Sequence, residues 1–217
     1  MTLGFDLFWS FRSPYSYLAT GRIVGLARTH RVDVRVRPVY PLAVRVPDFF
    51  QRVNPLWPAY VFRDTTRIAQ MLGLPFHWPR PDPIVQDMKT GAVARQQPYI
   101  HRLTRLGAAA ERRGRGLAFI DAVSQLIWSG EVAGWNDGEH LAKAAASAGL
   151  DLAELEAAIA GDVERYEAII SENEQAHAAA GHWGVPTMVF EGEPFFGQDR
   201  IDALTWRLQQ RGLEARS

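Results

Sequence analysis

The chain has 217 residues, of which 47% are hydrophobic and 22% charged, a composition typical of a globular protein with a substantial core. Basic and acidic side chains number 24 each, so the formal net charge is zero, which argues against a nucleic acid or an acidic membrane surface as the main partner. Cysteine is absent, which excludes disulfides, thiolate metal ligands and a cysteine nucleophile.

The first part of the chain predicts a strand–helix–strand unit. The apolar run Phe5 to Trp9 is typical of a buried strand, and a helix is expected from Pro14 to about Thr29, with Ser13 as its N-cap. Val32 to Arg37 alternates apolar and charged side chains, as a strand with one solvated face does, and Pro38 favours an edge strand. Because a crossover helix joins the two strands, we expect them to be parallel.

Two proline-rich stretches flank the next predicted helix, which runs from Tyr60 to Leu72. Residues 41–58 and 75–83 contain four prolines each, so the first should be irregular and the second a loop or the rim of a pocket. From about residue 86 to residue 182 nearly the whole chain is expected to be helical. The helices expected there are 96–113, 117–128, one capped by Asn136 or Asp137 that runs to Ala148, 152–160 capped by Asp151, and one capped by Asp162 that ends near Gly181 and Gly184.

The chain returns to strand periodicity near its C-terminus. Val185 to Phe190 and Glu193 to Phe196 are predicted strands, and Glu191-Gly192 favours a tight turn that makes them antiparallel. A last helix is expected to begin near Asp199, with this residue as its N-cap.

The order of these elements is βαβ, a long helical block and then ββα. It predicts an α/β fold with a mixed, four-stranded, thioredoxin-like sheet. We expect residues 1–41 and 184–217 to form one discontinuous thioredoxin-like domain, and residues 42–183 to form an inserted, all-helical domain.

Three segments carry a family likeness. They are FRSPYSYLA at residues 11–19, GVPTMV at 184–189 and FGQDR at 196–200. In these motifs, their order and their positions, the chain resembles 2-hydroxychromene-2-carboxylate isomerases and kappa-class glutathione transferases, the glutathione-using branch of the DsbA-like thioredoxin-fold proteins. The likeness covers essentially the whole chain, and it implies glutathione as the cofactor.

Ser13 is the candidate catalytic residue. Ser13 and Ser16 stand at the two ends of a four-residue spacing where thioredoxin-like oxidoreductases carry their cysteine pair. Because this chain has no cysteine, a thiol has to arrive with a ligand. A hydroxyl at a helix N-terminus can donate a hydrogen bond to a glutathione sulfur, and the helix dipole favours the thiolate. The alternative is that Ser13 is only an N-cap.

The resemblance implies five residues that bind glutathione. Val185 and Pro186 correspond to the cis-proline segment, which presents backbone groups to the cysteinyl part of glutathione. Asp199 and Arg200 correspond to the residues that meet the γ-glutamyl amine and carboxylate, an opposite-charge pairing that is chemically reasonable. Asn54 corresponds, through a looser match, to an asparagine that reaches the active site.

Two further residues are candidates for substrate contact. Arg12 is next to Ser13 and could bind a substrate carboxylate, although many relatives have an apolar or small residue there. Trp9 is the tryptophan nearest to the candidate site. The six histidines lack the spacing of a zinc site, and His177 and His182 are too far apart to share a helix face, so we expect no metal.

The leading interpretation is a glutathione-dependent isomerase that acts on an aromatic-derived, unsaturated 2-oxo acid by reversible thiolate addition. One alternative is a kappa-like glutathione transferase that conjugates electrophiles, and another is a non-catalytic thioredoxin-fold binding protein. The expected partners are a small-molecule substrate and, by resemblance, a second copy of the chain in a homodimer. A cytoplasmic location is expected because no run is apolar enough to span a bilayer and no leader sequence is visible.

Overall fold

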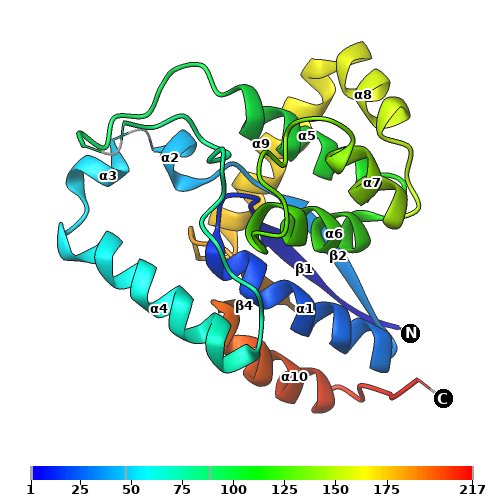
Figure 1. The fold of residues 1–217 in the computed structure, drawn as a ribbon. Coiled ribbons are helices and arrows are strands. Elements are labelled where there is room, and N and C mark those ends of the chain that lie inside the picture. The colour runs from blue at the N-terminus through cyan, green and yellow to red at the C-terminus, as the bar shows by residue number, and fades with distance from the viewer. Residues whose placement is uncertain (1, 47, 88, 217) are drawn as a thin grey trace.

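The protein is described by a computed structural model that covers residues 2–46, 48–87 and 89–216. A mixed four-stranded sheet lies at its centre, in the order β2-β1-β3-β4 (Figure 1). The strands are β1 (Leu3–Trp9), β2 (Val32–Pro38), β3 (Thr187–Phe190) and β4 (Glu193–Phe196). β1 and β2 are parallel, whereas β3 is antiparallel to both β1 and β4. The predicted α/β class and βαβ…ββα order are therefore confirmed.

The N-terminal unit is as predicted. Helix α1 spans Pro14–Thr29, and Ser13 caps it by accepting a hydrogen bond from the backbone N–H of Ser16. β2 lies at the edge of the sheet, where the proline at its end costs no ladder hydrogen bond. The loop between β1 and α1 therefore begins at the end of a buried central strand and leads directly into the N-terminus of α1.

The stretch before the predicted 60–72 helix is more regular than expected. Residues 41–58, predicted to be irregular, contain the one-turn helices α2 (Leu42–Arg45) and α3 (Phe49–Arg52). Helix α4 (Leu56–Leu72) begins ahead of Tyr60. Pro58 occupies its first turn, where the missing N–H would have had no helical acceptor. The proline content was therefore a poor guide to the start of this helix.

The prediction that residues 75–83 form a loop is confirmed, but the prediction that helical structure begins near residue 86 is wrong. Among the described residues, 86, 87 and 89–97 continue the loop and hold an isolated antiparallel bridge between Gln86 and Val93. The buried side chain of Gln97 bonds both backbone groups of Val85 and the carbonyl of Ala94. The side chain of one glutamine thus provides hydrogen-bond partners for three backbone groups that lie outside a helix.

The remaining helices follow the prediction closely. They are α5 (Pro98–Glu111), α6 (Gly116–Trp128), α7 (His140–Ser147), α8 (Leu152–Gly161), α9 (Val163–Ala179), the short 3₁₀ helix η1 (Gln198–Arg200) and α10 (Ile201–Gln209). Asp151 and Asp162 cap α8 and α9 as predicted. The predicted caps of α7 are wrong: α7 begins only at His140, and the side chains of Asn136 and Asp137 bond to each other in the preceding loop.

A single hydrophobic cluster joins the sheet to the helices. It contains Leu7 of β1 and Leu18 of α1 together with buried residues of the long helical block, among them Leu106 of α5 and Phe119 of α6. In Figure 1, α5 to α9 gather at one end of the sheet, and α1 and α10 lie along its other side. The proposed division into a thioredoxin-like and an inserted helical domain stays a prediction. No helix within the described ranges is long and apolar enough to cross a membrane.

Candidate functional site

Ser13 lies where β1 turns into α1, and its hydroxyl makes two hydrogen bonds. Its Oγ accepts a hydrogen bond from the backbone N–H of Ser16 at 3.2 Å, which is the predicted N-cap. The same hydroxyl donates to the backbone carbonyl of Val185, also at 3.2 Å. The side chain is half-buried. The hydroxyl proton therefore points from the α1 N-terminus toward the segment that precedes β3.

The Val185–Pro186 segment is held against this junction. Its peptide bond is cis, which was an expectation of the resemblance. The carbonyl of Pro186 accepts a hydrogen bond from the backbone N–H of Gly197 at 2.9 Å. The hydroxyl of Thr187 donates to the carbonyl of Gly184 at 2.7 Å. The segment therefore connects Ser13 on one side with the start of η1 on the other.

Asp199 and Arg200 lie in η1, which begins directly after Gly197. Because Gly197 is bonded to Pro186, the fold brings both residues to the same end of the sheet as Ser13. Their side chains form an ion pair with each other at 2.9 Å, and each is more than half exposed. The prediction that Asp199 caps the last helix is wrong, because Asp199 lies inside η1 and makes no capping hydrogen bond. Both charges remain accessible to a polar ligand.

Tyr15 joins this group from the first turn of α1, and the sequence did not point to it. Its hydroxyl donates to the carboxylate of Asp64 on α4 at 2.8 Å. Burial raises the pKa of Tyr15, and the hydrogen bond to Asp64 and the negative charge of Asp199 raise it further. Tyr15 is therefore a neutral donor that ties α4 to the start of α1.

Arg12 is paired, which changes its predicted role. Its guanidinium makes two hydrogen bonds to the carboxylate of Asp82, of which Nη2 to Oδ2 measures 2.7 Å. It also lies 4.7 Å from the ring centre of Trp78. The Arg12 side chain is only 11% exposed. A substrate carboxylate could use this charge only by displacing Asp82, a loop residue that the sequence analysis did not single out.

Trp9, selected from sequence as a candidate for substrate contact, lies in the core. The side chain is completely buried. Its indole N–H donates to the carbonyl of Ser16 and to the hydroxyl of Thr20, both inside α1. Trp9 is therefore a core residue that fixes α1 on the sheet. Ser16 is also fully buried, so Ser13 is the only accessible end of the four-residue spacing.

Asn54 lies in the exposed segment before α4. Its Oδ1 accepts a hydrogen bond from the backbone N–H of Leu56 at 2.9 Å, which satisfies a free group at the start of the helix. Among the described residues, no hydrogen bond connects Asn54 with Ser13. The structure thus gives Asn54 a local role at the start of α4, and its contact with the ligand stays a prediction.

Aromatic side chains that are far apart in the sequence gather around Trp183, two residues before Val185. Trp183 is 56% exposed. Its ring lies 6.2 Å from that of Phe49, which in turn lies 5.7 Å from that of Trp57. The rings come from α3, α4 and the segment before β3, which are far apart in the chain. Spacing along the sequence could not reveal this cluster, because only the folded chain assembles it.

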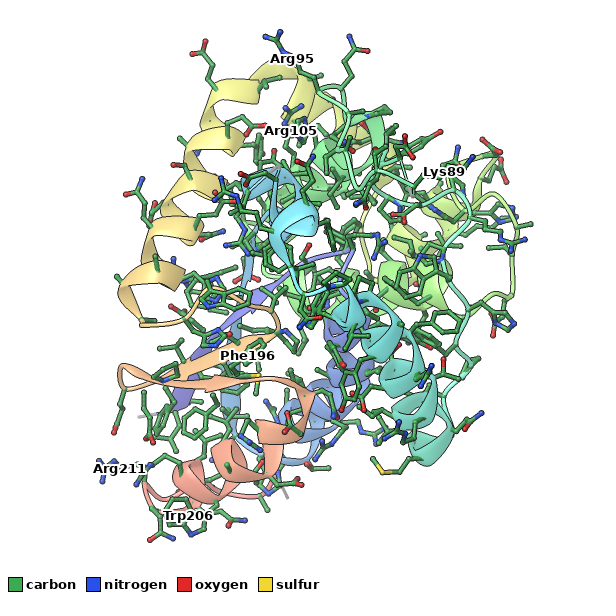
Figure 2. All side chains as sticks on the ribbon, turned by 90° about the vertical axis from the view of Figure 1, so that its left-hand side faces the viewer. Lys89, Arg95, Arg105, Phe196, Trp206 and Arg211 are labelled. Atoms are coloured by element: carbon green, nitrogen blue, oxygen red, sulfur yellow. The ribbon has the colours of Figure 1, made fainter. Side chains whose placement is uncertain are left out.

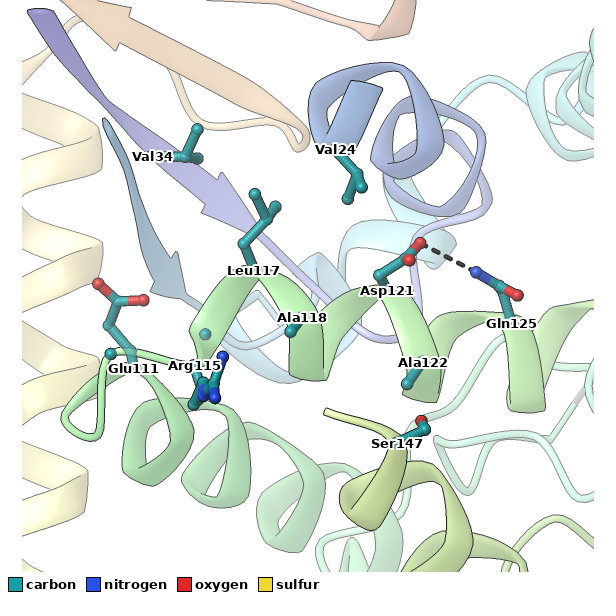
Figure 3. Close-up of a pocket in the computed structure, with 12 residues that line it drawn as sticks. Val24, Val34, Glu111, Arg115, Leu117, Ala118, Asp121, Ala122, Gln125 and Ser147 are labelled. Atoms are coloured by element: carbon teal, nitrogen blue, oxygen red, sulfur yellow. Dashed lines mark hydrogen bonds between the residues drawn. The ribbon is translucent and has the colours of Figure 1, made fainter. Parts of the chain in front are cut away.

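The molecule also contains a cavity of about 520 Å³ away from Ser13 (Figure 3). It lies between α1, β2 and α6, and none of the predicted site residues lines it. Burial raises the pKa of Glu111 and of Asp121 on its wall. Asp121 accepts a hydrogen bond from Gln125, one turn further along α6.

Among the described residues, no group of three histidine or acidic side chains is placed to hold a metal ion.

Comparisons with known proteins give a consistent result. The family model described as a DSBA-like thioredoxin domain matches residues 5–209. The 2-hydroxychromene-2-carboxylate isomerase of Pseudomonas putida is 26% identical over 213 residues, covering 90% of this chain and 89% of its own. Its counterpart from Pseudomonas sp. (strain C18) is 27% identical over 210 residues, covering 90% of this chain and 85% of its own.

Solved structures show the same fold. A 2-hydroxychromene-2-carboxylate isomerase aligns with a TM-score of 0.70 and 23% identity, covering 96% of this chain and 95% of its own. The cytosolic disulfide reductase DsbM from Pseudomonas aeruginosa, solved with GSH, aligns with a TM-score of 0.60 and 18% identity, covering 96% and 100%. The predicted thioredoxin-like arrangement with a helical insertion is therefore confirmed.

Proposed function

Because the chain belongs to the DSBA-like thioredoxin domain family, we propose that it is a glutathione-dependent isomerase of the 2-hydroxychromene-2-carboxylate type. The observation that carries the proposal is the Ser13 hydroxyl, placed at the N-terminus of α1 and directed at Val185 in a chain without cysteine. The names of the two curated relatives support an isomerase, and the neighbour solved with GSH gives a precedent for this ligand on this fold.

The residues at the site fit glutathione. Ser13 offers a hydroxyl donor, and the α1 N-terminus adds backbone N–H groups and a dipole that favour negative charge. The backbone of Val185 suits an extended peptide, and the exposed pair Asp199 and Arg200 suits the zwitterionic γ-glutamyl end. When bound, glutathione supplies a thiolate that adds reversibly to a conjugated 2-oxo acid, so that the former double bond can rotate.

Ser13 would stabilise the sulfur by redirecting its proton. In the structure the hydroxyl donates to the carbonyl of Val185. Rotation about the Cβ–Oγ bond would turn the proton toward a thiolate, while an Oγ lone pair still caps α1. The carbonyl of Val185 is then free to accept a hydrogen bond from the ligand. This exchange lowers the free energy of the thiolate relative to the thiol.

The surrounding side chains suit an aromatic substrate. Trp183 is exposed two residues before Val185, and its ring lies in a cluster with Phe49 and Trp57. Arg12 is the cation nearest to Ser13 in sequence, and a substrate carboxylate would reach it in exchange for Asp82.

Turnover of the wild-type protein tests the proposal. We expect reduced glutathione to bind in calorimetry and 2-hydroxychromene-2-carboxylate to isomerise only when glutathione is present, without net consumption of the thiol. Ser13→Ala should lower turnover by about tenfold to a hundredfold, the loss typical of a hydrogen bond to a charged group. Ser13→Thr keeps the hydroxyl and should stay within a few-fold of wild type.

The other outcomes separate the alternatives. Consumption of glutathione with formation of a covalent conjugate would identify a glutathione transferase. Absence of binding at millimolar glutathione would rule out both enzyme readings and leave a non-catalytic binding protein.

A further inference from the structure

His182 bonds the backbone just ahead of the Val185–Pro186 segment. Its Nδ1 accepts a hydrogen bond from the backbone N–H of Gly184 at 2.9 Å. An Nδ1 that accepts this bond carries no proton, so the imidazole is neutral with its hydrogen on Nε2. Gly184 is buried, and a Cβ there would lie 2.5 Å from the Phe196 ring. The glycine backbone therefore fits tightly between two side chains.

The His182 ring packs against two aromatic side chains. Its centre lies 4.0 Å from that of Phe196 and 5.6 Å from that of Trp183, nearly parallel to both. Figure 2 shows Phe196 beside the β4 ribbon, below the end of α9. Because Phe196 stacks on one face of the ring, the ring cannot turn its edge away from Gly184 without losing this stacking contact.

Three side chains bond the backbone between Gly184 and Val185. Thr187 donates to the carbonyl of Gly184, Ser13 donates to the carbonyl of Val185, and His182 accepts from the N–H of Gly184. The two hydroxyls keep their protons throughout the ordinary pH range. Only the bond to His182 can be lost by titration, because a protonated Nδ1 is a donor.

The surroundings of His182 disfavour protonation of its Nδ1, which would make the imidazole positively charged. Burial lowers the pKa of His182. The titratable group beside it is His177 of α9, with ring centres 6.5 Å apart. Arg45 of α2 donates to the carbonyl of the neighbouring residue Trp183 at 2.9 Å, and Phe196 of β4 brings no charge. A proton on Nδ1 of His182 would therefore point at the N–H of Gly184, so that two donors would meet without an acceptor.

We propose that neutral His182 is a positioning residue that sets the Gly184–Val185 backbone opposite Ser13, so that ligand binding at this site weakens when His182 becomes protonated. The proposal rests on the proposed glutathione site and adds a residue and a pH dependence to it. As the pH falls, the protonated fraction rises, Gly184 loses its acceptor, and the carbonyl of Val185 is no longer held toward Ser13.

Binding of S-methylglutathione across pH tests this, because the probe has no thiol that titrates. For the wild type we expect the Kd to rise as the pH falls below 6.5, because burial lowers the pKa of His182 from that value. His182→Asn places an amide oxygen where it can accept from the N–H two residues on, as in an Asx turn. This variant should bind like the wild type at neutral pH and lose the pH dependence. His182→Ala should bind about fivefold more weakly than the wild type at neutral pH, the effect of one lost hydrogen bond, and its Kd should not change further as the pH falls.

His140→Asn, on α7, is the matched control and should keep the wild-type profile. An unchanged affinity and pH profile in both His182 variants would overturn the proposal.

A second readout separates this proposal from the glutathione site itself. In the ligand-free protein, the NMR signal of the Gly184 amide should shift with pH in the wild type and in His140→Asn but not in His182→Asn. If S-methylglutathione and glutathione fail to bind at any pH, the proposed function falls, and the Gly184 titration still decides whether His182 controls this backbone. A Gly184 amide that does not respond to pH would contradict the role of His182.

Discussion

At the residue scale, Ser13 shows that a structural and a chemical role can share one side chain. A hydroxyl has one hydrogen to donate and two lone pairs that accept. Ser13 uses a lone pair to cap α1 and its hydrogen to bond Val185. Ser13 was predicted to cap α1, with the catalytic role in addition to the cap or absent. The geometry leaves room for both, because the cap does not use the proton that a thiolate would need.

The residues around Ser13 also show what a local motif cannot predict. Ser13, Val185 and Pro186 were predictable because motifs at both ends of the chain mark them. The burial of Trp9 was not, since a strand residue next to a loop can face either the core or a ligand. Nor was the pairing of Arg12 with Asp82, which lies 70 positions away in a loop without periodicity.

His177 gives a prediction for stability. It is completely buried and stacked on Phe8, and neither ring nitrogen has a hydrogen-bond partner among the described residues. Burial, and then the positive charge of Arg45, lower its pKa from 6.5 to about 4. Between pH 6.5 and about pH 4, His177 is protonated in the unfolded chain but neutral in the folded chain. The free energy of unfolding therefore falls as the pH decreases from 6.5 toward 4.

His177→Phe keeps the stacked ring and removes the titration. Urea unfolding at neutral pH and near pH 4.5 should therefore show a smaller acid-induced loss in the variant, by about 2–3 kcal/mol of unfolding free energy. An acid-induced loss equal to that of the wild type would contradict the effect assigned to His177.

At the scale of single elements, a helix start could be predicted where a side chain caps the helix. Asp151 and Asp162 follow that rule, and α8 and α9 begin where expected. Helix α7 begins without a side-chain cap, and Asn136 and Asp137 upstream of it bond to each other. The loop ahead of α5 was missed because the side chain of Gln97 bonds the backbone of Val85 and of Ala94, contacts that depend on the folded chain.

The contrast between these caps can be measured. Asp151→Ala removes an acceptor for the backbone N–H groups of Ala153 and Glu154, and should cost about 1 kcal/mol of unfolding free energy. Asp137→Ala is the matched control in a loop, and its effect should stay within about 0.5 kcal/mol. Equal losses in the two variants, measured by urea denaturation, would show that the cap assignment is wrong.

At the scale of the whole molecule, the site depends on both ends of the chain. The hydrogen bond between Ser13 and Val185 joins residues 172 positions apart, and the long helical block lies between them in sequence. That block shares one hydrophobic cluster with the sheet. Substitutions that loosen the packing of the helices should therefore also disturb the position of Ser13 relative to Val185. The homodimer and the cytoplasmic location stay predictions.

The shared core predicts one cooperative unfolding transition. Buried tryptophans report on both parts, because Trp9 lies in the sheet and Trp128 and Trp135 lie in the helical block. Tryptophan fluorescence and far-ultraviolet circular dichroism should give coincident urea transitions. Two separated transitions would show that residues 42–183 fold as a domain of their own.

The central claim is that the Ser13 hydroxyl and the α1 N-terminus stabilise a borrowed thiolate. The most direct test is the pKa of the glutathione thiol while it is bound, followed through the ultraviolet absorbance of the thiolate. In the wild type this pKa should lie well below that of free glutathione, and Ser13→Ala should raise it by about one unit or more, since one unit corresponds to about 1.4 kcal/mol. Ser13→Thr should keep the wild-type value. An identical thiol pKa in the wild type and in Ser13→Ala would contradict the account and leave Ser13 as a helix cap alone.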